Sequence, residues 1–126
     1  MHHEPLVPLV PLVPLQITFR DLEKSEALDA RIRDQVDKLG QFYSGIHSCR
    51  VTVEKLHKHQ RQGNHFHVHI DIKTPDHELV AGREPDQHHA YTDVYVAVRD
   101  AFKAMRRQLE DLVQKQQGQV KHHTQV

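Results

Sequence analysis

HFHVHIDI, the sequence of residues 65–72, carries the clearest structural signal in the chain, an unbroken alternation of polar and apolar residues. Successive side chains of a β-strand point to opposite faces, so this period predicts a half-buried strand. One face would carry only apolar residues, and the other would carry three histidines and an aspartate. The apolar face needs a covering layer, which the sequence on either side has to supply.

Shorter runs with the same period lie on both sides of this strand. Residues 15–20 and 49–54 alternate in the same way and predict two strands that precede it. After it, Thr74–His77 predicts a tight turn, in which Pro75 would fix φ at the second position. Residues 78–82 then predict a last, short strand.

A helix is predicted between the first two strands. Ser25 offers an N-cap, and acidic residues follow it in the first turn, where the helix dipole favours negative charge. Four apolar residues recur at helical spacing and would form one buried face: Leu28, Ile32, Val36 and Leu39. Gly40 and Gly45 bracket the expected end of this helix.

A second, longer helix is predicted after the last strand. It would run from about Asp93 to Gln116, with Thr92 as its N-cap and Gly118 as its stop. Its expected apolar stripe consists of Val94, Val98, Ala101, Met105, Leu109 and Leu112. Each helix therefore offers an apolar face that can cover the sheet.

Together these elements predict an α+β fold, a two-layer sandwich with the order β-α-β-β-β-α. The strand–helix–strand unit favours a parallel pair, and the later strands would form antiparallel hairpins, so the four-stranded sheet is mixed. Both helices would pack on one face of it. We divide the chain into a Pro-rich extended arm at residues 1–14, the α+β domain at 15–116 and a polar tail at 117–126.

Composition excludes several classes of protein. The 126 residues include 17 basic and 17 acidic ones, so the chain is not a strongly basic nucleic-acid binder overall. A single cysteine, Cys49, excludes an internal disulfide and a Cys-rich zinc site. No apolar run approaches the roughly 20 residues of a membrane span, so we expect a cytoplasmic protein with no membrane partner.

No catalytic arrangement is visible, and we predict that the chain is not an enzyme. The sequence has no Gly-rich phosphate loop and no His-Glu-x-x-His motif. Cys49 falls on the apolar side of its predicted strand, where a buried, unreactive thiol is expected rather than a nucleophile. We predict no cofactor.

Histidine is unusually abundant, with 13 in the chain. His65, His67 and His69 would lie on one face of their strand, about 6.5–7 Å apart. Two such imidazoles can reach one metal ion, but no cysteine accompanies them and no carboxylate stands at a recognisable ligand spacing. The row is therefore either a solvated polar face, a surface that contacts a partner, or a metal site, in decreasing order of preference.

Local clusters of basic residues are the strongest candidates for a binding surface. Between residues 50 and 73 five basic residues stand against two acidic ones, and Lys55, Lys58 and Arg61 are the densest group. On the second helix Arg99, Lys103 and Arg106 fall at i, i+4 and i+7, with Arg107 beside them. Such residues can neutralise RNA phosphates. They can equally form a salt-bridged surface, because Arg106 with Glu110 and Arg107 with Asp111 are i,i+4 pairs.

Several stretches, in order, resemble the ribosome hibernation promoting factors and ribosome-associated inhibitors, in their short form. Residues 93–98 (DVYVAV) and 107–109 (RQL) are similar to the C-terminal helix of that family. Residues 15–19 (LQITF) resemble its first strand, and Lys38-Leu39 and residues 74–81 (TPDHELVA) match later segments. The likeness covers residues 15–116, in register with the predicted fold.

The resemblance implies a translation regulator that binds the 16S rRNA of the small ribosomal subunit. The domain would lie in the decoding channel and block messenger RNA and tRNA in stress or stationary phase. Lys38, Arg107 and Lys115 look like basic positions of the family, whereas Arg31, Lys103 and Arg106 share those surfaces by helix geometry. The candidate RNA-binding residues are Arg31, Lys38, Lys55, Lys58, Arg61, Arg99, Lys103, Arg106, Arg107 and Lys115. We expect no DNA partner, and the alternative is a non-ribosomal metal-binding or protein-interaction module.

Overall fold

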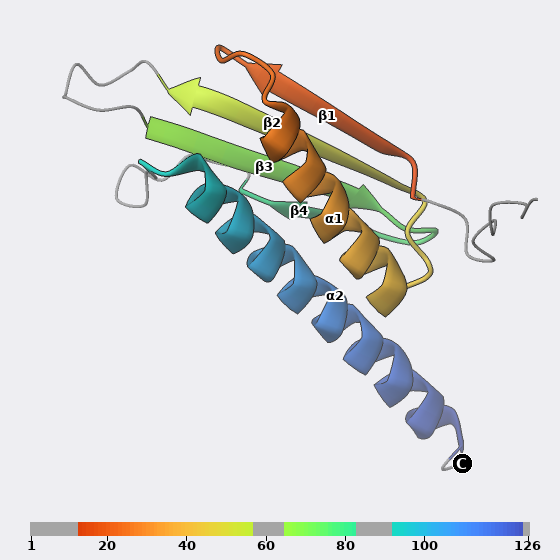
Figure 1. The fold of residues 1–126 in the computed structure, drawn as a ribbon. Helices are drawn as coiled ribbons and strands as arrows, with labels where there is room; N and C mark the ends of the chain where they lie inside the picture. Colours follow the sequence, from red (N-terminus) through yellow and green to blue (C-terminus); the bar gives the residue numbers. More distant parts are fainter. Residues whose placement is uncertain (1–12, 57–64, 83–91, 125–126) are drawn as a thin grey trace, which may run out of the picture.

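A computed structural model describes residues 13–56, 65–82 and 92–124 of the chain, with side chains as far as residue 118. The elements follow the predicted order. They are β1 (Leu15–Arg20), α1 (Glu26–Phe42), β2 (Ser48–Leu56), β3 (His65–Lys73), β4 (Glu78–Ala81) and α2 (Val94–Thr124) (Figure 1).

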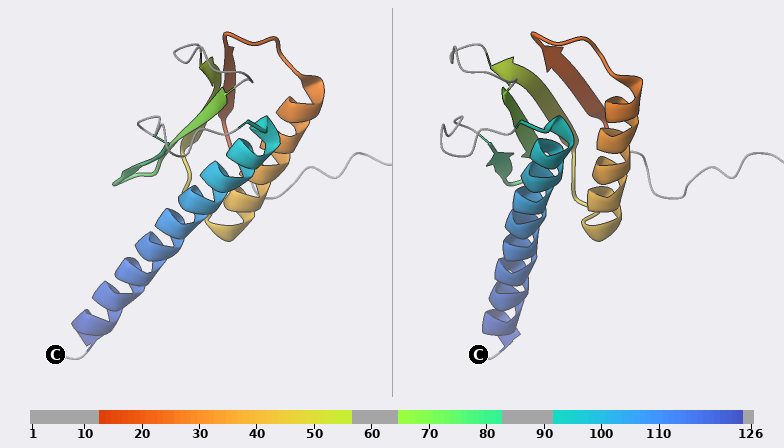
Figure 2. Two further views of the ribbon diagram at one scale, coloured as in Figure 1. Left: turned by 90° about the vertical axis from the view of Figure 1, so that its left-hand side faces the viewer. Right: turned by 60° about the vertical axis from the view of Figure 1, so that its left-hand side comes forward.

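The four strands form one mixed sheet in the order β1-β2-β3-β4. β1 runs parallel to β2, whereas β2, β3 and β4 pair antiparallel, as the sequence predicted. Both helices lie on the same face of the sheet, side by side, and the last part of α2 extends beyond it (Figure 2). The predicted α+β fold is therefore confirmed.

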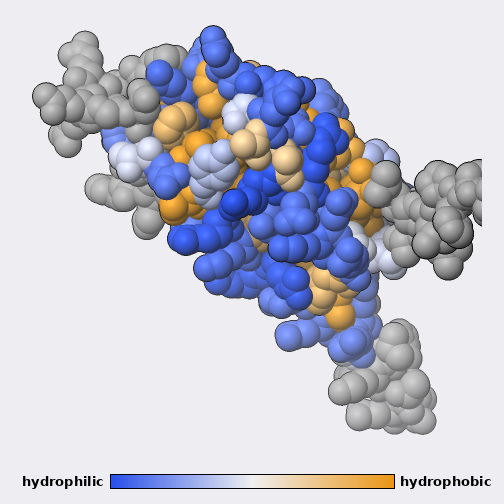
Figure 3. Space-filling model, in the orientation of Figure 1, coloured by the Kyte–Doolittle hydropathy of each residue, from blue (hydrophilic) through white to orange (hydrophobic). Residues whose placement is uncertain are grey.

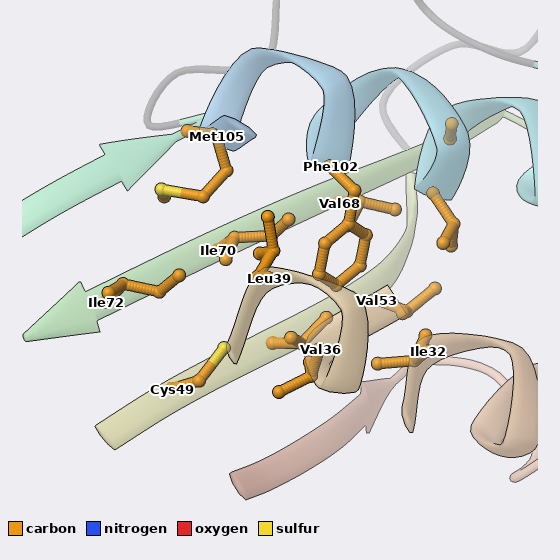
Figure 4. Packing of buried hydrophobic residues seen from close by; sticks show 14 of the residues in the cluster. Ile32, Val36, Leu39, Cys49, Val53, Val68, Ile70, Ile72, Phe102 and Met105 are labelled. Atoms are coloured by element: carbon orange, nitrogen blue, oxygen red, sulfur yellow. The ribbon is translucent and has the colours of Figure 1, made fainter. Parts of the chain in front are cut away.

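The hydrophobic core lies between the helices and the covered face of the sheet. Val68, Ile70 and Ile72 of β3 are buried there, while Phe66 at the start of the strand is half-buried. Phe102 of α2 lies among residues of α1 and the sheet in this layer (Figure 4). Full burial of a side chain of this size contributes about 1.5–3 kcal/mol, so this layer is the main source of stability.

Helix α1 begins as predicted. The Ser25 hydroxyl accepts a hydrogen bond from the Leu28 backbone N–H at 3.1 Å and so caps the helix. All four predicted apolar residues of α1 are buried. The helix continues through Gly40 to Phe42, and the Tyr43 N–H donates to the Leu39 carbonyl at its end.

Helix α2 differs from the prediction at both ends. Asp93, rather than Thr92, caps it, because its carboxylate accepts from the Tyr95 N–H at 2.8 Å. Gly118 does not stop the helix, which continues to Thr124. A glycine ends a helix by adopting a left-handed conformation, and Gly118 does not have one. Inside an exposed helix it costs only about 1 kcal/mol relative to alanine.

A tight turn and one side-chain hydrogen bond from α2 stabilise the far edge of the sheet. The turn between β3 and β4 is the predicted one: the Thr74 N–H donates to the His77 carbonyl at 2.9 Å, and the His77 N–H donates to the Thr74 hydroxyl at 3.1 Å. The Gln108 amide of α2 donates to the Val80 carbonyl of β4 at 2.8 Å. The hydrogen bond between Gln108 and Val80 links α2 to the edge strand and so helps to position the helix over the sheet.

Candidate functional site

A groove of about 240 Å³ runs between α1 and α2 on the outer side of the helix layer. Most of the surface that the molecule presents there is hydrophilic (Figure 3). The described residues that line the groove are Gln35, Lys38, Leu39, Arg99, Phe102, Lys103 and Arg106. Four of these seven carry a positive charge, and none is acidic.

Helix geometry explains why the basic side chains lie along the groove between α1 and α2. Leu39 and Phe102 point down into the core and are each 3 % exposed, so they form an apolar floor. On α2, Arg99, Lys103 and Arg106 follow one another at i, i+4 and i+7, which places them on neighbouring turns along one side of the helix. Lys38 of α1 faces them from the opposite wall.

Carboxylates beside the groove balance part of this charge. Lys38 lies 3.2 Å from Asp34, Arg99 3.0 Å from Asp100 and Arg106 3.5 Å from Glu110. The side chains of all three pairs are substantially exposed to solvent, and such pairs are worth about 0–1 kcal/mol. A phosphate can therefore replace these carboxylates at little cost.

Lys103 and Arg106 differ in how firmly they are held. Within the described ranges Lys103 has no ion pair, and its side chain is exposed. The Arg106 guanidinium lies over the Phe42 ring of α1, 4.4 Å from its centroid, a contact that favours this position at the junction of the two helices. The groove thus combines one cation that contacts both helices with one that is free to reorient toward a ligand.

The remaining predicted residues lie outside the groove lining. Arg31 is exposed on α1, and Arg107 and Lys115 are exposed on α2. Lys55 is half-buried near the end of β2. Lys58 and Arg61 lie outside the described residues, as does the Pro-rich arm up to residue 12.

One of the two predicted ion pairs on α2 is present. Arg106 and Glu110 pair, whereas Arg107 and Asp111 form no ion pair in the part of the chain that the structure describes. The sequence reasoning missed Phe102 and Gln35 as groove residues. The position of Phe102, four residues after Val98 in the apolar stripe, was the available signal for its place in the core.

The histidine row lies on the other side of the molecule, on the face of the sheet that neither helix covers (Figure 2). His65, His67 and His69 are half-buried there, because β3 is an inner strand with neighbours on both sides. Burial lowers the pKa of His67, an effect that the Gly82 backbone and the Glu54 carboxylate partly oppose. Among the described residues, no three histidine, cysteine or acidic side chains are grouped so that they could hold a metal ion.

Cys49 is buried in β2, as the sequence predicted. Burial, together with the negative charge of Asp71, raises the pKa of its thiol to about 12. The thiol is therefore protonated at neutral pH and is a poor nucleophile.

No helix in the described part of the chain is both long enough and apolar enough to cross a bilayer. Helix α2 has 31 residues, but charged and amide side chains recur along its whole length.

Comparison with known proteins gives a consistent result. The family model described as sigma 54 modulation protein / S30EA ribosomal protein matches residues 15–117. A ribosomal subunit interface protein from Coxiella burnetii has a similar structure, with a TM-score of 0.64 and 16% identity over 79% of this chain and 97% of that one. The Protein Y N-terminal domain of Thermus thermophilus gives 0.55 and 15% over the same shares. The search of curated proteins finds no match.

Proposed function

The chain belongs to the sigma 54 modulation protein / S30EA ribosomal protein family, and from this membership we propose that it binds the small ribosomal subunit through the groove between α1 and α2. Phosphates of the 16S rRNA lie against the groove cations, and the volume of the domain blocks messenger RNA and tRNA in the decoding channel. No bond is made or broken. The protein acts in the cytoplasm, in stress or stationary phase, when ribosomes are idle.

The observation that carries this proposal is the charge of the groove lining. Four cations converge on a groove in which no acidic side chain is among the described lining residues, although the chain as a whole has no net charge. Lys and Arg side chains placed in this way bind phosphates and release the counterions that surround RNA. This surface therefore has the electrostatic character of an RNA-binding site, which the overall composition conceals.

Further cations extend this surface along the helices. Arg31 lies on α1, and Arg107 and Lys115 lie on α2, all exposed to solvent. We assign them to additional RNA contacts around the central groove. Lys55 is half-buried at the end of β2 and would contribute only at the margin of the interface.

The test is co-sedimentation of the purified chain with small ribosomal subunits through a sucrose gradient. Replacing one cation on each wall of the groove, in the variant Lys38→Glu/Lys103→Glu, should weaken binding by at least about tenfold, because phosphate contacts are replaced by repulsion. Lys24→Glu/Lys73→Glu is the matched control. It changes the net charge equally, but at exposed lysines away from the groove.

Salt dependence provides a second measurement. Each lost phosphate contact should lower the slope of log affinity against log salt by about 1, so the groove variant should lose about 2. Equal binding by the two variants would show that general charge, and not the groove, accounts for the association. Absence of binding by the unmodified chain at modest ionic strength would overturn the proposal altogether.

A further inference from the structure

An exposed aromatic ring stands close to the groove. Tyr95 lies in the first turn of α2, one helical turn before Arg99, and is 37 % exposed. It is the one large apolar side chain in the described part of the chain that is exposed to this degree. The Arg31 guanidinium of α1 lies over its ring, 5.5 Å from the centroid. An aromatic ring with a cation beside it therefore lies next to the basic residues of the groove.

The exposure of this ring contrasts with the burial of the other aromatic side chain of α2. Phe102, two turns further along α2, is 3 % exposed and packs in the core. Tyr95 lies on nearly the same side of α2 but seven residues earlier, in the first turn, where the Arg31 side chain of α1 lies over its ring. Within the described ranges Arg31 has no ion pair, and its side chain contacts the tyrosine ring. Tyr95 does not belong to the hydrophobic core cluster or to the partly buried residues packed against it, so the pair lies at the surface.

An aromatic ring next to cations favours one kind of nucleic acid. In an RNA duplex the bases are stacked on one another, and a protein meets mainly phosphates and 2′-hydroxyl groups. Only an unpaired base can stack on a side-chain ring, and such stacking adds affinity with little dependence on sequence. The combination of ring and cations therefore matches a single-stranded segment or a base turned out of a helix.

We propose that Tyr95 and Arg31 bind an unpaired RNA base, which stacks on the tyrosine ring while its neighbouring phosphates contact Arg99 and Lys103. This inference rests on the proposed function and specifies the RNA that the surface takes. The same surface without Tyr95 would still bind phosphates, but it would no longer distinguish single-stranded from double-stranded RNA.

The experiment compares the full chain with Tyr95→Leu and Tyr95→Phe. The probes are a fluorescently labelled single-stranded RNA of about ten nucleotides and the duplex that it forms with its complement, at one salt concentration. Tyr95→Leu should lower single-strand affinity about five- to a hundredfold and leave duplex affinity unchanged, whereas Tyr95→Phe should keep both. Thermal unfolding of each variant establishes that the fold is intact.

Tyrosine fluorescence gives an independent readout. The chain has no tryptophan and three tyrosines, so the variant Tyr43→Phe/Tyr91→Phe leaves Tyr95 as its single emitter. Stacking of a base should quench this emission when single-stranded RNA saturates the protein. Emission that does not change, or no measurable binding of the single strand, would overturn the inference.

Failure of this inference can be told apart from failure of the proposed function. If Tyr95→Leu binds both RNA forms and small subunits as the unmodified chain does, stacking is excluded and the groove proposal stands. If Lys38→Glu/Lys103→Glu still binds small subunits fully, the groove proposal fails whatever Tyr95 does.

Discussion

The two faces of β3 carry alternate residues of one strand, yet they contact quite different surroundings. Val68, Ile70 and Ile72 lie beneath the helices and are at most 4 % exposed. His65, His67 and His69 lie on the face that no helix covers and remain half-buried. The comparison teaches that stability depends on the covered face, whereas the histidine face contributes little beyond its backbone pairing.

The comparison extends to charge. The helix layer above the covered face carries lysine and arginine side chains, which stay charged at every physiological pH. The opposite face carries a row of histidines. Lysine and arginine side chains suit a surface that binds phosphates. Substitutions on the two faces, and at the groove, are therefore expected to differ in their effects.

The largest difference in stability is expected between substitutions at Ile70 and His69, neighbouring residues of β3 that point to opposite faces of the sheet. Ile70→Ala should lower the free energy of unfolding by about 2–5 kcal/mol, because it leaves a cavity at a fully buried site. His69→Ala removes a half-buried side chain from the other face and should cost about 1 kcal/mol or less. Urea unfolding measures both, and similar losses would contradict the contrast.

The second prediction concerns Gly82, which follows β4 and lies close to the backbone of β3. Gly82 has a φ of +73°, and a Cβ atom there would lie 2.2 Å from the Val68 carbonyl oxygen. Gly82→Ala should therefore cost about 1–3 kcal/mol. Gly118→Ala is the matched control, since it sits in an open helical position and should add up to about 1 kcal/mol. Thermal unfolding should show a lower melting temperature for Gly82→Ala and a higher one for Gly118→Ala.

The third prediction concerns pH. Because burial lowers the pKa of His67, the unfolded chain binds a proton at this residue more readily than the folded one. The stability associated with His67 is complete above its ordinary pKa of about 6.5 and is lost as the pH falls from there through the lowered folded value. His67→Gln should make the decline shallower. Unfolding free energies measured from pH 7.5 to 5 would refute this if both proteins gave the same slope.

The smallest effect is expected at the edge of the groove. Glu110→Gln removes the exposed partner of Arg106 and should cost about 0.3–0.5 kcal/mol of stability. It should also strengthen RNA binding slightly, since a phosphate no longer competes with the carboxylate. Glu23→Gln is a suitable control, because it removes an equal charge at an exposed site outside the groove. An equal increase in RNA affinity in both variants would mean that the net charge of the protein, and not the ion pair at the groove, controls RNA binding.

Some features of the helices could not be read from the sequence with certainty. Thr92 and Asp93 both have side chains that cap helices, and only the backbone geometry selects Asp93. Gly118 resembled a stop signal, but a glycine ends a helix only when the following chain turns away. The candidate cations of the two helices are exposed, yet their periodicity did not reveal which of them line a groove.

The order and type of the elements, the buried faces of the helices and the cap at Ser25 could all be predicted from the sequence alone. These features depend on the period of apolar residues and on contacts between residues that are close in the chain, which the sequence displays directly. The packing of the two helices, by contrast, was needed to show that Lys38 lines a groove with Arg99 and Lys103, and that Arg31 lies over Tyr95. These residues are about 60 positions apart in the sequence, so their contact depends on how the two helices pack against the same sheet and against each other.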